Sequence, residues 1–169
     1  MSTNLTPEAR EKLLMFLQRH RLGVIASTGP DGQSQSALVN IAVTPELEIL
    51  FETTCETRKF GNIERDPRVS LVVGWEGQET VQLEGVAMRP EGKARERARD
   101  VFVAAFPQKE SDEYWPGNSY FLVRPRWLRF SSYYRPRWME EYVLGTPDEK
   151  PQTLCARLKA RFQAGHRSG

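Results

Sequence analysis

Two adjacent cations at the start of a short predicted helix are the residues of this chain best suited to chemistry. In Thr57-Arg58-Lys59 the threonine is typical of a helix N-cap, whose hydroxyl accepts a hydrogen bond from the first turn. That end of a helix is electropositive and normally favours Asp or Glu, so Arg58 and Lys59 are unusual there. A bound anion, most simply a phosphate, would explain both cations. The alternative is a solvated helix whose cations point into water.

A second group of candidate residues lies near the end of the chain, where arginines and aromatic residues are interleaved. Such a pattern can bind single-stranded nucleic acid by stacking and charge neutralisation. We favour strand alternation, with aromatic side chains in the core or at a dimer face and arginines reaching solvent or carboxylates, because the net charge is only +2. One of these arginines, Arg129, is also a candidate for contact with a cofactor across a dimer. The residues are Arg124, Arg126, Trp127, Arg129, Phe130, Tyr133, Tyr134, Arg135, Arg137 and Trp138.

The histidines and cysteines form no pattern of a catalytic or metal site. His20 and His166 have no carboxylate or nucleophile near them in sequence, so we expect both at the surface. Cys55 precedes the short helix and is expected to be either a small buried side chain or, if exposed, a thiol of lowered pKa. Cys55 and Cys155 form no CxxC pair, which indicates neither a metal nor a disulfide framework and favours a reduced, cytoplasmic setting.

Length and composition indicate one globular domain followed by a polar extension. The chain has 169 residues, of which 39% are apolar and 27% charged, as in ordinary soluble proteins. The polar start of the chain is unlike a signal peptide, and no apolar run reaches the ~20 residues that span a bilayer, so no membrane partner is expected. We expect a domain over residues 1–145 and a basic extension over residues 146–169, with a helix around 154–162.

Turn signals and periodicity predict a mainly β fold, a six- to seven-stranded antiparallel β-barrel with added helices. Thr6-Pro7-Glu8 opens a helix that runs to about Arg21 and buries Leu13, Phe16 and Leu17. Hairpin-length connections argue against a parallel sheet, and no glycine fingerprint for nucleotides occurs. The predicted strands are 22–27, 33–43, 47–53, 69–75, 80–89, 120–123 and 127–131. The other predicted helices are 58–65, stopped by Asp66-Pro67, and one in which Ala94, Ala98, Val101, Phe102 and Ala105 share a face.

The succession Ala37-Leu38-Val39-Asn40, Phe51-Glu52-Thr53, Thr57-Arg58-Lys59 and Asp66-Pro67-Arg68-Val69-Ser70-Leu71 resembles the pyridoxamine 5′-phosphate oxidase-like flavoproteins. The resemblance covers roughly residues 22–131 and implies a split β-barrel that forms a homodimer, with FMN at the subunit interface. It implies that Arg58 and Lys59 hold the FMN phosphate beside Thr57, that Glu52 and Thr53 lie next to the flavin, and that the backbone of Ala37, Leu38, Val39 and Asn40 follows the isoalloxazine ring. Thr80 falls where oxidases of the family place a glutamine, and Gln82 lies two residues away on the same strand face.

Three departures from the family pattern bear on the reaction. Ala42 occupies the position of a lysine that holds the substrate phosphate in true pyridoxamine phosphate oxidases, and Ser131 that of a tryptophan over the flavin. The substrate-binding Tyr, Arg and Ser set is missing from residues 101–112. We therefore expect an FMN-dependent oxidoreductase that acts by hydride transfer at N5 on another small organic substrate. The alternatives are a non-enzymatic flavin- or haem-binding protein and a deazaflavin-binding variant, whose longer phosphorylated tail Arg65 and Arg68 are available to bind.

Overall fold

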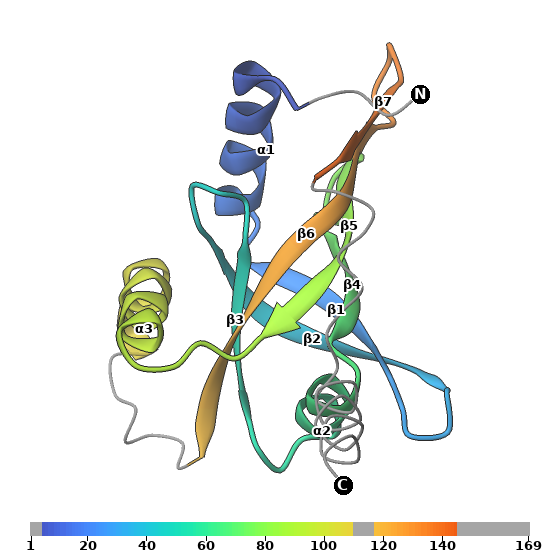
Figure 1. Ribbon diagram of the computed structural model, residues 1–169. Coiled ribbons are helices and arrows are strands. Elements are labelled where there is room, and N and C mark those ends of the chain that lie inside the picture. The colour runs from blue at the N-terminus through green and yellow to red at the C-terminus, as the bar shows by residue number, and fades with distance from the viewer. Residues whose placement is uncertain (1–4, 110–116, 145–169) are drawn as a thin grey trace, which may run out of the picture.

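Antiparallel strands close into a six-stranded barrel, and a seventh strand extends the sheet beyond it (Figure 1). The computed structural model describes residues 5–109 and 117–144. The sheet order is β3-β2-β1-β4-β5-β6-β7, and the pairing of β3 with β6 closes the barrel. The predicted mainly β architecture is therefore confirmed. The strands are β1 (Leu22–Thr28), β2 (Ser34–Val43), β3 (Ile49–Thr54), β4 (Arg68–Val73), β5 (Glu79–Met88), β6 (Asn118–Ser132) and β7 (Trp138–Val143).

Alternation of apolar and polar residues places the core inside the barrel. In β4, Val69, Leu71 and Val73 are buried, whereas the residues between them are exposed. Phe51 of β3 and Phe121 of β6 are Cα partners whose rings stack with centroids 5.5 Å apart inside the barrel. The same alternation leaves the outer face of β1, β4, β5 and the first part of β2, up to Asn40, without a covering helix in the described part of the chain, whereas α3 covers the end of β2. The positions of the helices can be followed in Figure 1.

Two helices close the ends of the barrel. α1 (Pro7–Arg19) begins after its N-cap Thr6 and buries the predicted stripe Leu13, Phe16 and Leu17. The Phe16 ring lies 4.8 Å from that of Phe130 and fills the space over Gly74, where a φ of +79° and the close ring both require glycine.

At the opposite end, α2 (Arg58–Arg65) buries Asn62 and Ile63 (Figure 1). The Asn62 amide donates to the Ser27 hydroxyl at 3.1 Å and to the side-chain oxygen of Gln35 at 3.0 Å, so α2 is tied to β1 and β2.

α3 (Lys93–Ala105) packs on the outside of the barrel and is followed by a 3-10 turn, η1 (Pro107–Lys109). Ala98 and Phe102 form a second buried cluster with Ala42 and Leu50, the outward residues of β2 and β3. Ala94, predicted on the same helix face, is exposed, because the face in contact begins one turn later. None of the described helices has the length and apolar composition needed to cross a bilayer.

The C-terminal strands differ most from the sequence prediction. The two strands predicted over 120–123 and 127–131 are one strand, β6, which pairs with β3, β5 and β7. β7 was not predicted at all. It is held to α1 by Lys12, whose ammonium lies 3.6 Å from the centroid of the Trp138 ring. The predicted extension over residues 146–169, with its helix, lies outside the described residues.

A β-bulge between β5 and β6 allows the long strand to continue through Pro125. Glu84 pairs with Trp127 and Gly85 pairs with Pro125, so Arg126 is the extra residue without a partner on β5. Gly85 is required here, because a Cβ at this position would lie 2.5 Å from the carbonyl oxygen of Arg124. Pro125 lacks an N–H and is compatible with a central strand only at such an irregularity.

Candidate functional site

The first turn of α2 is built around two threonine hydroxyls. Thr57 is the N-cap, as predicted, and its Oγ1 accepts from the Phe60 N–H at 3.4 Å. The Thr57 hydroxyl also lies 2.8 Å from that of Thr53, and 3.0 Å from the carbonyl oxygen of Thr54, to which it donates. Thr53 is buried at the end of β3. The helix start is therefore fixed to the barrel strand that precedes it.

The two cations follow this cap with no acidic residue in the first turn. Arg58 is exposed and Lys59 is half-buried. Burial lowers the pKa of the Lys59 ammonium from its ordinary value of 10.5. Neither side chain forms an ion pair within residues 5–109 and 117–144, although the exposed Glu56 is close in sequence. The backbone N–H groups of Arg58 and Lys59 lie in the helical turn that has no intrahelical acceptors.

Glu52 lies near the end of β3, and Cys55 is the first residue after this strand, in the turn that leads into α2. Glu52 points away from the barrel interior and accepts from the Asn118 amide at 2.8 Å. Cys55 is exposed, which excludes the buried alternative for this thiol. Its backbone N–H donates to the carbonyl of Gly117 at 3.2 Å, so the turn is held against the start of β6.

The segment Ala37–Asn40 forms one edge of the split in the barrel. β2 pairs with β1 from Ser34 to Asn40 but with β3 only from Ile41 to Val43. The Ile41 N–H bonds the Arg21 carbonyl on the β1 side, so by strand alternation the N–H and C=O groups of Leu38 face the side from which β3 has separated. The side chains of Ala37 and Val39 point inward, whereas that of Leu38 is 60% exposed.

Thr80 and Gln82 lie on the outer face of β5, on either side of the buried Val81. Leu38, Val24, Val72 and Gln82 are successive Cα partners across β2, β1, β4 and β5. Three strand spacings separate Leu38 from Gln82, which corresponds to about 14 Å. The structure thus joins Thr53 of β3 to the α2 turn through the Thr57 hydroxyl, whereas β2 contacts α2 through Gln35 and Asn62. It does not bring Thr80 and Gln82 to the exposed backbone of Leu38 within one chain.

Four of the arginines proposed for other roles have carboxylate or carbonyl partners. Arg129 forms a 2.5 Å ion pair with Glu141, and its guanidinium lies 5.1 Å from the Trp127 ring centroid. Arg124 pairs with Glu48 at 3.1 Å. Of the two arginines considered for a longer phosphorylated tail, Arg65 donates to the carbonyl of Thr28 and Arg68 pairs with Asp66 at 2.6 Å.

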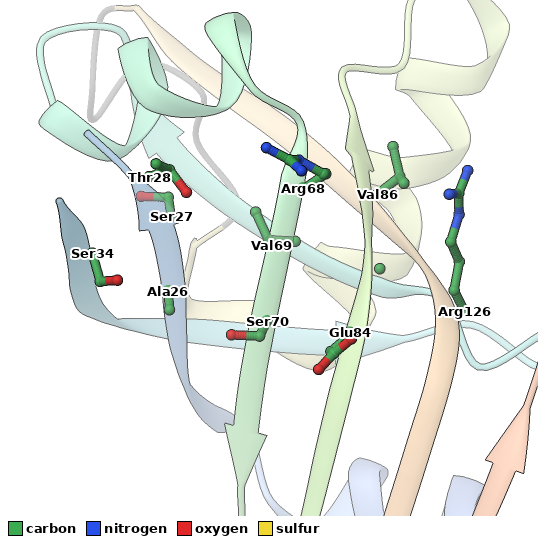
Figure 2. A pocket seen from close by; sticks show the side chains of 11 residues that line it. Ala26, Ser27, Thr28, Ser34, Arg68, Val69, Ser70, Glu84, Val86 and Arg126 are labelled. Atoms are coloured by element: carbon green, nitrogen blue, oxygen red, sulfur yellow. The ribbon is translucent and has the colours of Figure 1, made fainter. Parts of the chain in front are cut away.

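A pocket that the sequence analysis did not predict lies on the outer face of the barrel. It has a volume of about 530 Å³ and is lined by side chains from β1, β2, β4, β5 and β6 (Figure 2). Polar and charged residues contribute much of its lining, including Thr28, Ser34, Arg68, Ser70, Glu84 and Arg126. The one signal in the sequence was Pro125 within a strand-like segment, which marks the bulge that positions Arg126.

Comparison with known proteins identifies relatives of the same fold. The family described as "Pyridoxamine 5'-phosphate oxidase" matches residues 9–132. No curated protein matches the chain significantly. A heme binding protein from Mycobacterium smegmatis is similar in structure, with a TM-score of 0.69, 21% identity and coverage of 82% of this chain. The chain spans only 59% of the length of that protein.

Two further solved structures match this chain over almost their whole length. General Stress Protein 26 from Bacillus anthracis is 19% identical with a TM-score of 0.62, and the match covers 80% of this chain and 98% of that one. A Clostridium acetobutylicum protein related to general stress protein 26, of the pyridoxinephosphate oxidase family, is 11% identical with a TM-score of 0.61, covering 81% and 95%. At these identities the structural similarity concerns the fold.

Proposed function

The chain belongs to the pyridoxamine 5′-phosphate oxidase family, and from this membership we propose that it binds FMN and acts as an FMN-dependent oxidoreductase. Its substrate is a small organic molecule other than pyridoxamine phosphate. The observation that carries the proposal is the pair of cations, Arg58 and Lys59, at the capped N-terminus of α2.

Lys59 supports a phosphate ligand at this turn. Within the described residues the half-buried Lys59 ammonium has no carboxylate partner, and burial, which removes water from the charge, lowers its pKa. A phosphate would replace the lost hydration and would also accept bonds from the free N–H groups of the first turn. Thr57 then has a positioning role, because its hydroxyl fixes the direction in which the turn opens.

The unpaired edge of β2 suits the ring of a flavin. Its pyrimidine part needs backbone donors and acceptors, which Leu38 offers on the side of the split, and its apolar part needs a surface such as the exposed Leu38 side chain. A bound flavin would supply a hydride acceptor at its N5 atom. The residues Ala37–Asn40, Glu52 and Thr53 would hold and orient it beside the α2 turn.

Ala42 argues against pyridoxamine phosphate as the substrate. This residue stands where true oxidases of the family carry a phosphate-binding lysine, and it is buried beneath α3 with Leu50 and Phe102. A methyl side chain in an apolar cluster offers no donor to a substrate phosphate. The oxidised substrate must therefore be recognised by other groups.

We further propose that the protein is a homodimer. Leu38 and Val72 are exposed on the uncovered face of the sheet, at 60% and 38% of their surface, with Val24 between them in register. A second copy on this face would bury them. It would also allow the partner's β5, with Thr80 and Gln82, to approach a flavin held by β2, which one chain alone does not permit.

The proposal is tested by removing the two cations together. FMN affinity of Arg58→Ala/Lys59→Ala should fall by at least 100-fold, since each charge-assisted hydrogen bond contributes about 1.5–3 kcal/mol. The measurement is quenching of FMN fluorescence on titration with protein. Lys93→Ala/Arg97→Ala removes the same charge from exposed positions of α3 and should leave the affinity unchanged.

Three results would contradict parts of the proposal. Unchanged affinity in the Arg58/Lys59 variant would mean that the cofactor binds elsewhere. A Soret band in the purified protein, in place of flavin absorbance, would favour a haem-binding function like that of the Mycobacterium smegmatis protein. Bound FMN that neither NADH nor NADPH reduces under anaerobic conditions would favour a flavin-binding module over an oxidoreductase.

A further inference from the structure

The buried Asn62 of α2 connects the two parts of the proposed FMN site. The turn assigned to the phosphate is on α2, and the strand edge assigned to the ring is on β2. We propose that Asn62 is a positioning residue, which fixes α2 relative to β2 so that one FMN molecule reaches both parts at once. The inference rests on the proposed function and deepens it, because it explains how phosphate and ring are recognised together.

The side-chain amide of Asn62 bridges two neighbouring strands. Its nitrogen donates to the Ser27 hydroxyl at 3.1 Å and to the Gln35 Oε1 at 3.0 Å. Ser27 and Gln35 are Cα partners across β1 and β2, so the two bonds grip one cross-strand pair. Asn62 is only 3% exposed. A displacement of the helix would leave these buried polar groups without partners, which makes the present position of α2 strongly favoured.

The half of β2 assigned to the flavin ring lacks a neighbour on one side. Between Ser34 and Asn40 this strand pairs with β1 but not with β3 in the described part of the chain. The Gln35 side chain lies on the inward face of β2 and meets α2 there. Its bond to Asn62 therefore ties the free half of β2 to the helix, which lies beside the β1–β2 hairpin (Figure 1).

Both ends of this tie are close to the residues assigned to FMN. Asn62 follows Lys59 by three residues, which is about 4.5 Å along the axis of α2. Gln35 precedes Leu38 by three residues, which is about 10 Å along β2. The Gln35–Asn62 bond thus lies on a short path between the phosphate turn and the ring edge. When it is broken, fewer molecules have both parts correctly placed, and the apparent affinity for FMN falls in proportion.

The test compares FMN with its two parts, riboflavin and inorganic phosphate. Gln35→Met removes the acceptor and keeps a side chain of similar length. The change is made at the half-buried Gln35 because a substitution of Asn62 would also break the bond to Ser27. Affinity for FMN should fall about tenfold, as expected for the loss of one hydrogen bond. Affinities for riboflavin and for phosphate should be unchanged, since each part of the site remains intact. Flavin fluorescence measures the first two ligands and phosphorus NMR the third.

Two further variants separate positioning from stability. Gln33→Met is the matched control, because it makes the same replacement at an exposed residue just before β2 and should leave all three affinities unchanged. Gln35→Glu keeps an oxygen that accepts from the Asn62 amide and should retain most of the FMN affinity. Equal losses for all three ligands in Gln35→Met would assign the bond to stability alone. Either that result or an unchanged FMN affinity would overturn the inference.

Failure of the proposed function gives a different pattern. If the wild type binds FMN no more tightly than riboflavin, the phosphate is not held at the α2 turn, and the proposed function fails together with the inference. If Arg58→Ala/Lys59→Ala loses the preference for FMN over riboflavin and Gln35→Met keeps it, the proposed function stands and only the positioning role of Asn62 is refuted.

Discussion

At the scale of single residues, the sequence predicted the helix cap of the candidate site, but it did not predict which of the neighbouring side chains are buried. The cap at Thr57 followed from the residue type alone, because only a few side chains can accept a hydrogen bond from a first helical turn. The exposure of Cys55 and the inward orientation of Thr53 did not follow. Both depend on how the end of β3 meets the start of β6, which is a contact between segments far apart in sequence.

If Lys59 holds the phosphate of FMN as proposed, its lowered pKa should make FMN affinity sensitive to alkaline pH. A phosphate prefers the charged ammonium, so the affinity should fall as the pH rises through the Lys59 pKa, which lies below 10.5. Lys59→Arg keeps its charge and should retain the affinity to higher pH. The measurement is the FMN dissociation constant from neutral pH upward.

The same ionisation acts in the opposite direction on the empty protein. Its folded-state pKa is below the unfolded value, so folding releases a proton and the free energy of unfolding rises with pH across this interval. If the FMN dissociation constants of the wild type and of Lys59→Arg depend on pH in the same way, Lys59 does not contact the phosphate.

At the scale of elements, local patterning predicted the first five strands and failed for the last two. The hairpins of β1 with β2 and of β4 with β5 carry their own turn signals, so their register is largely local. Pro125 led to the prediction of two strands where the structure has the single strand β6. The bulge that accommodates this proline depends on the partner strand β5 and on Gly85, which local sequence does not reveal. β7 is rich in charged residues and was missed, since its contacts are with β6 and Lys12.

The bulge gives a prediction for Gly85. Gly85→Ala places a methyl group 2.5 Å from the carbonyl oxygen of Arg124 and should lower the free energy of unfolding by about 1–3 kcal/mol. Gly61→Ala is the matched control, because a Cβ at this position of α2 has open space and alanine is the better helix former. Urea denaturation measures both. Equal stability of Gly85→Ala and the wild type would mean that the strands do not approach so closely.

At the scale of the whole molecule, the barrel presents one sheet face that no described helix covers. Leu38 and Val72 are exposed on this face, with the half-buried Val24 between them in register. Exposed apolar side chains gathered in this way are typical of an interaction surface. The sequence predicted a dimer through the family resemblance and through the aromatic residues near the end of the chain. Identifying the residues on this face required the strand order and register of the structure.

Leu38→Lys should convert the proposed homodimer into a monomer. The side chain is 60% exposed, so the substitution costs little in the folded chain but places a charge in the expected interface. Met15→Lys is the control, because Met15 is equally exposed at 60% but lies on α1, away from this face. Molar mass from light scattering after gel filtration distinguishes the variants. A wild type that is monomeric at micromolar concentration would refute the homodimer.

The packing of α1 against the last two described strands has a consequence for synthesis in the cell. The helix is synthesised before all the strands, yet the rings that contact Phe16 and Lys12, those of Phe130 and Trp138, belong to the last two described strands. Translation of the intervening segment takes on the order of 10 s. During that time the apolar stripe of α1 has β2 to pack against but lacks the surface that β6 and β7 supply, so part of the stripe should stay exposed to solvent.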